Sequence, residues 1–215
     1  MTVHIRHPRT LLAAGALALL GLIPAGAQAQ NVVFGNWTLL NSEGTYGVLR
    51  PGSPWGPGSS PATQVTVVDG TFEPENQQWN NGSWWWDEDL SVNPDIGSYS
   101  KPMGVDITLN AAYTVNRLVM QADDNDSYRV EYWDGSAWLL AWDVPAVNTF
   151  GLVTRDSGLL SPITTDKFRL YATGGDLYYS ISEFQAFAVP EPGTWAMMAL
   201  GLMGGGALAR RRRRS

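Results

Sequence analysis

Hydrophobic and polar residues alternate in several segments in the second half of the chain. In residues 128–142, YRVEYWDGSAWLLAW, two alternating runs flank Asp134-Gly135, a dipeptide that favours a tight hairpin turn. Successive strand residues point to opposite faces, so the first run has an apolar face that we expect in the core. That face consists of Tyr128, Val130 and Tyr132, and the opposite face consists of Arg129, Glu131 and Trp133.

The same alternation recurs closer to the C-terminus. Residues 167–173, KFRLYAT, would bury Phe168, Leu170 and Ala172, and residues 178–189 are again rich in aromatic and β-branched residues. Near the N-terminus, NVVFGNWTLL predicts one more strand, and the Pro/Gly/Ser-rich stretch at 50–62 predicts a linker or long loop. No stretch between the chain ends keeps a helical period with caps. We therefore predict an all-β sandwich.

The first 29 residues have the pattern of a signal peptide. Arg6 and Arg9 form a basic start, residues 11–23 are apolar, and Ala27-Gln28-Ala29 matches a small-residue cleavage site. The chain has no Cys, and its only histidines, His4 and His7, lie in this segment. The mature chain would then lack thiol nucleophiles, Ser-His-Asp triads and histidine-ligated metals.

Charge is distributed unevenly along the chain. All 20 acidic residues lie between Glu43 and Glu191, where only seven basic residues accompany them, a net charge of −13. A body this acidic repels phosphate groups, which argues against a nucleic-acid partner.

The last 27 residues combine three features. Pro190, Glu191, Pro192 and Gly193 form a segment that cannot join a sheet or helix interior, because proline fixes φ and lacks an amide donor. Residues 195–209 carry no charge and would span roughly 23 Å as a helix at ~1.5 Å per residue. Five arginines follow at 210–214 and would remain cytoplasmic, so the acidic body would lie outside the inner membrane.

Together these features resemble the PEP-CTERM sorting domain of Gram-negative bacteria. The resemblance implies recognition by an exosortase, transient anchoring in the inner membrane by a transmembrane helix, and cleavage near residues 190–193. It also implies delivery to the cell surface or to an exopolysaccharide (biofilm) matrix. The alternative is a short core helix followed by a solvated basic tail. We divide the chain accordingly into 1–29, 30–61, 62–188 and 189–215. Whether residues 30–61 complete the sandwich stays open.

The body from about residue 62 to 187 resembles the discoidin, or coagulation factor 5/8 type C, domain. The resemblance lies in VVDGTF, GVDITLNAAYTVNRLVMQADDNDSYRVEYWDGSAW and FRLYATGGDLYYSISEFQAF. It implies a galactose-binding-like jelly roll in which Trp138 fills the core. Most members of this family bind carbohydrates or lipid headgroups, and few are catalysts by themselves.

The same resemblance implies a structural Ca²⁺ held by Asp69 and Glu183. The sequence departs from the family pattern, because Glu73-Pro74 stands where a hydroxyl residue is usual. The alternative is an ordinary turn residue at Asp69 and a strand-edge carboxylate at Glu183. The run Asp123 to Asp126 lacks the ligand spacing of an EF-hand, so we expect a strand-connecting corner and only secondarily a ligand-side loop.

Trp84, Trp85 and Trp86 are followed directly by three acidic residues. Neighbouring strand residues alternate sides, so we expect at least one of the three rings to be exposed. Aromatic rings cover the apolar C–H faces of sugars, and carboxylates accept hydrogen bonds from their hydroxyl groups. We therefore select these three residues and Trp133 as candidate ligand-binding residues, with core packing as the alternative.

The features favour an exported, non-catalytic protein that binds a carbohydrate, such as the exopolysaccharide of its own cell. A structural surface or biofilm-matrix protein without a sugar ligand is the first alternative. A polysaccharide hydrolase is the second, but it needs two acidic residues held across a glycosidic bond, and no spacing singles out such a pair.

Overall fold

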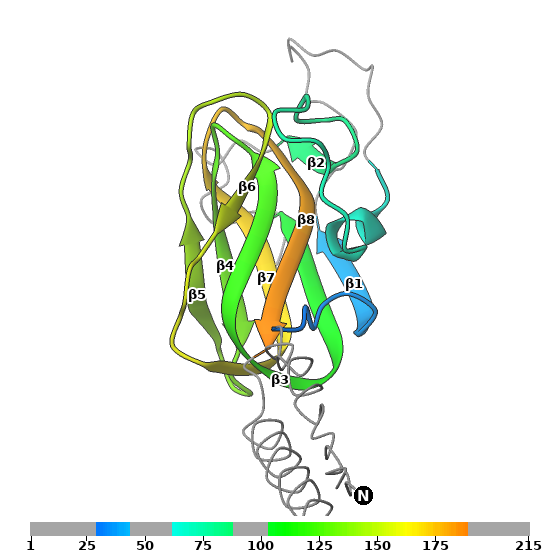
Figure 1. Cartoon of the computed structure of the whole chain (residues 1–215), viewed down its shortest axis with the longest axis vertical. Coiled ribbons are helices and arrows are strands. Elements are labelled where there is room, and N and C mark those ends of the chain that lie inside the picture. The colour runs from blue at the N-terminus through cyan, green and yellow to red at the C-terminus, as the bar shows by residue number, and fades with distance from the viewer. Residues whose placement is uncertain (1–28, 44–61, 88–102, 189–215) are drawn as a thin grey trace, which may run out of the picture. The chain divides into compact units, whose positions relative to one another are not determined.

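The computed structural model describes residues 29–43, 62–87 and 103–188, and these residues are mostly in strands (Figure 1). The elements are β1 (Trp37–Glu43), the 3-10 helix η1 (Gln64–Val68), β2 (Trp84–Asp87), β3 (Gly104–Asp123), β4 (Ser127–Trp133), β5 (Trp138–Val144), β6 (Leu152–Asp156), β7 (Ile163–Gly174) and β8 (Tyr178–Ala188). The described residues contain no α-helix, and the all-β prediction is confirmed. Residues 1–28 of the predicted signal peptide (1–29) and the predicted C-terminal segment at 189–215 lie outside the described residues.

The long strand β3 belongs to both layers of the sandwich. Its first half pairs with β1 and β7, and its second half pairs with β6 and β8. The strand order is β2-β8-β3-β7-β4-β5, with β1 and β6 as further partners of β3. Phe168 of β7 and Phe184 of β8 lie on different halves of this arrangement, yet their ring centroids are 5.3 Å apart. The sheet therefore folds over itself along β3, and its two parts enclose the core (Figure 1).

The core consists of the apolar faces that the alternation predicts. Tyr128 and Val130 of β4 and Phe168 and Leu170 of β7 are fully buried, and Tyr132 packs against them. The hairpin predicted at Asp134-Gly135 joins β4 to β5. In β4 and β7 buried residues alternate with more exposed ones, so each of these strands presents one face to the core and the other to the surface.

The N-terminal strand begins later than predicted. The segment from 31 first makes a turn, in which the amide of Asn36 donates to the carbonyl of Val33 and Gly35 adopts a φ of 74°. The strand β1 then starts at Trp37 and pairs with the first half of β3. Residues 37–43 thus belong to the sandwich.

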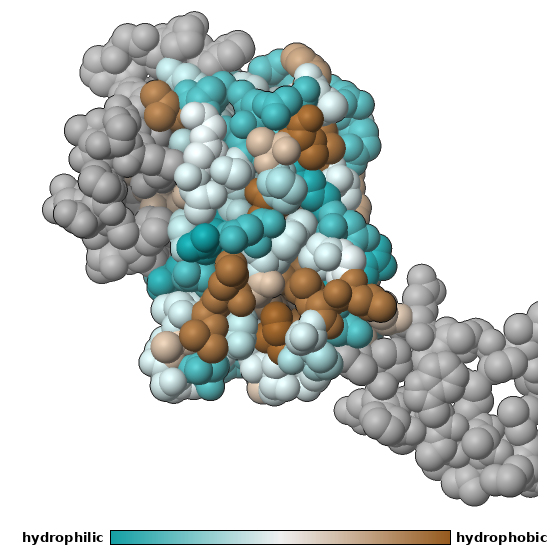
Figure 2. Space-filling view, turned by 90° about the vertical axis from the view of Figure 1, so that its left-hand side faces the viewer, coloured by the Kyte–Doolittle hydropathy of each residue, from teal (hydrophilic) through white to brown (hydrophobic). Residues whose placement is uncertain are grey.

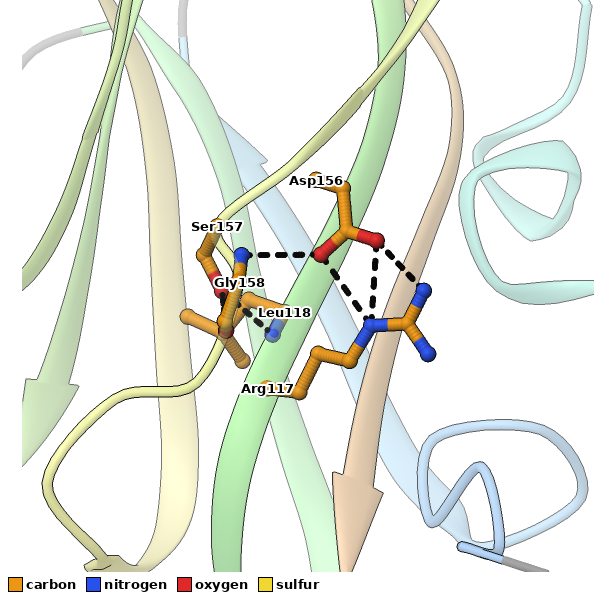
Figure 3. Close-up of polar contacts among 5 residues, drawn as sticks. All are labelled: Arg117, Leu118, Asp156, Ser157 and Gly158. Atoms are coloured by element: carbon orange, nitrogen blue, oxygen red, sulfur yellow. Dashed lines mark hydrogen bonds and ion pairs between the residues drawn. The ribbon is translucent and has the colours of Figure 1, made fainter.

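The end of β6 is fixed to β3 by polar contacts (Figure 3). The Asp156 carboxylate accepts hydrogen bonds from the Arg117 guanidinium and from the amide of Gly158. The hydroxyl of Ser157 accepts a hydrogen bond from the amide of Leu118 at 2.9 Å. These bonds continue the connection between the two strands beyond the last β6 residue.

All described residues belong to one compact unit, Ala29–Pro190. Within the described ranges, no helix has the length and apolar character that crossing a membrane requires.

Candidate functional site

The three consecutive tryptophans of β2 are buried. Trp84, Trp85 and Trp86 are 8%, 1% and 0% exposed, so the expectation that at least one of them is exposed is wrong. Trp84 and Trp86 point into the main core, whereas Trp85 points to the other side of the strand and packs against Trp79 and Tyr178. Alternation does place them on opposite faces, but Trp79 of the preceding loop and Tyr178 of β8 cover the second face. A buried ring offers no face to a sugar.

The open tryptophans lie on the β4–β5 hairpin instead. Trp133 and Trp138 are paired across the hairpin, their ring centroids are 5.6 Å apart, and both are half-buried. Trp133 follows the core-facing Tyr132, so it lies on the outer face of the layer formed by β1, β3, β7, β4 and β5. Trp138 lies beside Trp133 and not in the core, contrary to what the family resemblance implies.

Two cations of β7 lie over these rings. The ammonium group of Lys167 is 5.8 Å from the ring centroid of Trp133, and the guanidinium of Arg169 is 4.1 Å from that of Trp138. Arg169 also forms an ion pair with Asp106 of β3 at 3.0 Å. The strand register brings these groups together, because β7 lies between β3 and β4.

Hydrogen-bonding groups continue this face on the same strands. The Tyr171 hydroxyl donates to Glu131 at 2.9 Å, and Arg129 forms an ion pair with Asp143. Partial burial and the bond to Glu131 raise the pKa of Tyr171 to about 12, so this hydroxyl remains a hydrogen-bond donor at neutral pH. We name the following set the outer-face platform: Glu131, Trp133, Trp138, Lys167, Arg169 and Tyr171.

The platform resembles a binding surface more than a catalytic site. Half-buried aromatic rings beside fixed donors and acceptors can hold a polar ring compound. The view onto the side of β5 and β6 shows apolar residues gathered in the lower half of that face (Figure 2). Leu139 and Leu140 of β5 are 40% and 53% exposed.

Sequence alternation indicated that Lys167, Arg169 and Tyr171 face outward, but it gave no sign that they meet the β4–β5 hairpin. That contact depends on strand order and register, which a single sequence does not reveal.

The two residues of the predicted calcium site lie close together. The amide of Gly70, next to Asp69, donates to the Glu183 carboxylate at 3.2 Å. Glu183 is fully buried, and its other carboxylate oxygen accepts from Gln185. Burial, with a further contribution from the Asp69 charge, raises the pKa of Glu183 to about 8.

This pair fits a cation in its charge but supplies few ligands. Two carboxylates lie near one another, and no ion pair joins either of them to a basic side chain of the described residues. No group of three His, Cys, Asp or Glu residues is gathered for a metal in the described part of the chain. A Ca²⁺ ion, which takes six to eight oxygens, would need backbone carbonyls or water for most of its coordination.

The acidic run at the end of β3 forms the predicted strand-connecting corner, and the corner is buried. Asp123, Asp124 and Asp126 are 4%, 6% and 0% exposed. The carbonyl of Asp124 accepts from the amides of Val147 and Asn148, so the corner also ties down the loop between β5 and β6. Burial raises the pKa of Asp123 to about 7 and that of Asp126 to about 8, with added repulsion among the carboxylates.

The hydrogen bonds around Tyr128 match a protonated Asp126. The Tyr128 oxygen lies 3.0 Å from a carboxyl oxygen of Asp126, from the carbonyl of Ser180 and from the amide of Ser180. A phenol has one proton to donate, so it cannot donate to both Asp126 and the Ser180 carbonyl. If Asp126 is protonated and donates to Tyr128, every contact joins a donor to an acceptor.

Arg155 of β6 completes the corner and was missed from the sequence. It is 5% exposed, donates to the carbonyl of Asp123 and lies 5.9 Å from the Tyr128 ring centroid. Burial lowers the pKa of Arg155, and the neighbouring carboxyl groups oppose that shift. Its place opposite Met120 in the β3–β6 register points it inward, which residues 152–156 alone do not reveal.

Comparisons with known proteins give two kinds of similarity. Residues 188–214 match the PEP-CTERM protein-sorting motif, which confirms the sorting signal predicted at the C-terminus and indicates export. A search of curated proteins finds no match.

Several solved structures are similar to the chain. The family 32 carbohydrate-binding module of Streptococcus pneumoniae EndoD is 17% identical, with coverage of 74% of this chain and 100% of that chain and a TM-score of 0.46. The family 32 module of C. perfringens NanJ, in complex with galactose, is 16% identical, with coverage of 57% of this chain and 82% of that chain and a TM-score of 0.38. Chitosan-binding module 1 from Paenibacillus sp. IK-5 is 16% identical, with coverage of 74% of this chain and 99% of that chain and a TM-score of 0.43.

Proposed function

We propose that the protein is an exported, non-catalytic carbohydrate-binding protein that holds a saccharide on the outer-face platform. One observation carries the proposal: Trp133 and Trp138 form a half-buried aromatic pair on the surface of a sheet, beside fixed polar groups. A pyranose ring has an apolar face that packs on an aromatic ring and hydroxyl groups at its rim. Glu131 and the Tyr171 oxygen, whose proton is donated to Glu131, supply acceptors for those hydroxyl groups.

The charges on the platform favour binding over hydrolysis. A glycosidase needs one carboxylic acid and one carboxylate facing each other across the bond, with separated pKa values. Glu131 is bonded to Tyr171, and Asp106 is neutralised by Arg169. Both carboxylates therefore stabilise the positions of neighbouring side chains, and the saccharide would dissociate without being hydrolysed.

The sorting motif supplies the route by which the protein would meet a polysaccharide. An exosortase would cleave near Pro190 to Gly193 after the apolar segment has anchored the chain in the inner membrane. The released body would reach the cell surface or the extracellular matrix, where it would bind the exopolysaccharide of its own cell. A Ca²⁺ ion at Asp69 and Glu183 would stabilise this body, with backbone carbonyls and water as the remaining ligands.

A glycan panel tests the binding role. The full-length protein is screened against immobilised neutral and acidic oligosaccharides and against exopolysaccharide extracted from its host. Trp133→Ala and Trp138→Ala are compared with Phe150→Ala, which removes a 57% exposed ring from the loop between β5 and β6. We expect saturable binding that weakens at least about tenfold in the two platform variants and is unchanged in Phe150→Ala.

Two results would contradict the proposal. Binding that survives both tryptophan substitutions in folded protein would place the site elsewhere. The absence of binding to every saccharide would favour a structural surface protein, for which the exposed Leu139 and Leu140 of the edge strand β5 would provide a contact with other proteins. Release of new reducing ends from a bound polysaccharide would show that the protein is a hydrolase.

A further inference from the structure

Lys167 is the one basic side chain of the described residues without a polar protein partner. The other basic residues of these ranges are all engaged by carboxylates or a carbonyl: Arg117 with Asp156, Arg129 with Asp143, Arg169 with Asp106, and Arg155 with the Asp123 carbonyl. The backbone of Lys167 bonds to Thr165, but within the described ranges its ammonium group forms no ion pair or hydrogen bond and lies over the ring of Trp133. This cation is unpaired although the chain has 20 acidic residues against 14 basic ones.

The position of Lys167 places this unpaired charge where it can contact a ligand bound on Trp133. The residue lies on the outer face between Trp133 of β4 and Thr108 of β3, and Leu39 of β1 follows in the same row. This row is free of carboxylates, whereas the next row contains Asp106, Arg169 and Glu131. A ligand that packs on Trp133 therefore has a free ammonium group at one end and the Glu131–Tyr171 pair farther along the face.

We infer that the platform selects an acidic saccharide, whose ring packs on Trp133 and whose carboxylate is bound by Lys167. This inference rests on the proposed carbohydrate-binding function and names the class of sugar. A uronate has its carboxylate attached directly to the pyranose ring, so ring and charge reach Trp133 and Lys167 together. A neutral sugar makes the ring contact but gains nothing from the ammonium group.

The net negative charge of the protein reduces its affinity for long acidic polysaccharides. A long polyanion is repelled by the many surface carboxylates, but this repulsion is screened beyond about 8 Å at physiological salt. A short oligosaccharide touches only the platform and reports the local charge. The preference for acid over neutral sugar is therefore best measured with a short ligand.

Trigalacturonate and its fully methyl-esterified form provide a matched pair of probes, since the ester keeps the rings and removes the charges. Binding to the full-length protein is measured by calorimetry at physiological salt. We expect wild-type protein to prefer the free acid by about two- to fivefold, the range of a partly exposed ion pair. Lys167→Met should bind both probes with the wild-type affinity for the ester, and Lys167→Arg should keep the preference. Arg117→Met removes the same charge from outside the platform, at the contact with Asp156 of β6, and should leave the preference unchanged.

The outcomes separate this inference from the function on which it rests. Equal binding of acid and ester by wild-type protein, still lost in Trp133→Ala, overturns the acidic-sugar inference and leaves the carbohydrate-binding proposal intact. A preference for the acid that survives Lys167→Met, or that Arg117→Met abolishes, also overturns the inference. Absence of binding to both probes and to the glycan panel overturns both proposals.

Discussion

The chain has two groups of tryptophans, and the structure treats them in opposite ways. The β2 group, Trp84 to Trp86, stands out in the sequence, but all three side chains are buried. The hairpin pair, Trp133 and Trp138, is separated by a turn and less conspicuous, but it is half exposed on the sheet surface. Local composition therefore did not indicate exposure. The deciding factor is whether another segment covers the outer face of the strand.

The difference follows from what lies against each strand. The inner face of β2 meets Tyr128 and Tyr179 in the core, and its other face is covered by Trp79 and Tyr178. On the β4–β5 hairpin, the inner face of β4 is buried, and the two rings on the outer face lie against Lys167 and Arg169 of the neighbouring strand β7. The first group can thus serve stability, and the second can serve recognition.

Replacing one tryptophan from each group should separate these two roles. Trp86→Ala removes a fully buried ring from the core, which we expect to lower the free energy of unfolding by about 3–5 kcal/mol. Trp133→Ala removes a half-exposed ring, and we expect a loss of about 1 kcal/mol or less. Urea unfolding of both variants measures the two values. Similar losses of unfolding free energy in the two variants would show that Trp133 also stabilises the fold, and the two tryptophan groups would then not differ in role.

These two groups also show how far sequence carries the interpretation. Alternation correctly predicted the buried faces of β4 and β7 and the hairpin turn, because a strand with one apolar face determines which side is inward. It failed at Trp85, since the cover comes from the fold of the preceding loop, which contains Trp79, and from Tyr178, which is distant in sequence. The Lys167–Trp133 contact and the inward direction of Arg155 depend on register between strands that are not consecutive in sequence. Such pairings arise from the whole fold and leave no mark within a single segment.

Charged groups also differ between buried and exposed positions. The buried Asp126 should have a larger effect on stability than an exposed charge. Its pKa is about 8 because of burial, against an ordinary value of 3.8, so the folded state retains a proton that the unfolded state releases. The stabilisation is fully present below about pH 4 and is lost as the pH rises through about 8, a decrease of a few kcal/mol. Asp123, whose pKa is about 7, contributes in the same direction.

Asp126→Asn should remove part of this pH dependence. An asparagine amide can donate to the Tyr128 hydroxyl, and its carbonyl can accept from the Asp176 amide, so it reproduces the hydrogen bonds of the protonated acid. We expect stability near wild-type at pH 5 and higher than wild-type at pH 8.5, measured by thermal unfolding. A variant that is strongly destabilised at pH 5 would show that Asp126 is ionised in the native protein.

Calcium provides a third test, at a second place where carboxylates lie close together, the buried Glu183 and the partly exposed Asp69. If the ion is bound at 100 times its Kd, chelation should cost about 2.7 kcal/mol, or roughly 5–10 °C in Tm for a domain of this size. Glu183→Gln should abolish the response to chelator, whereas Asp166→Asn, outside the proposed site, should retain it. An unchanged Tm on chelation of the wild-type protein would show that it binds no stabilising Ca²⁺.

The exposed ion pair of Arg117 and Asp156 should give the smallest effect (Figure 3). Hydrogen bonding from Arg117 lowers the pKa of Asp156, so this pair contributes stability above the ordinary carboxyl pKa and loses it as the pH falls, the reverse of Asp126. Both side chains are more than 40% exposed, so solvent screening limits the loss in Arg117→Met to about 1 kcal/mol or less. Urea unfolding at pH 7 and pH 3 measures it, and the difference between variant and wild type should shrink at the lower pH. A loss of several kcal/mol would instead show that the contact at the end of β6 holds the two strands together, and that an exposed charge can matter as much as a buried one in this protein.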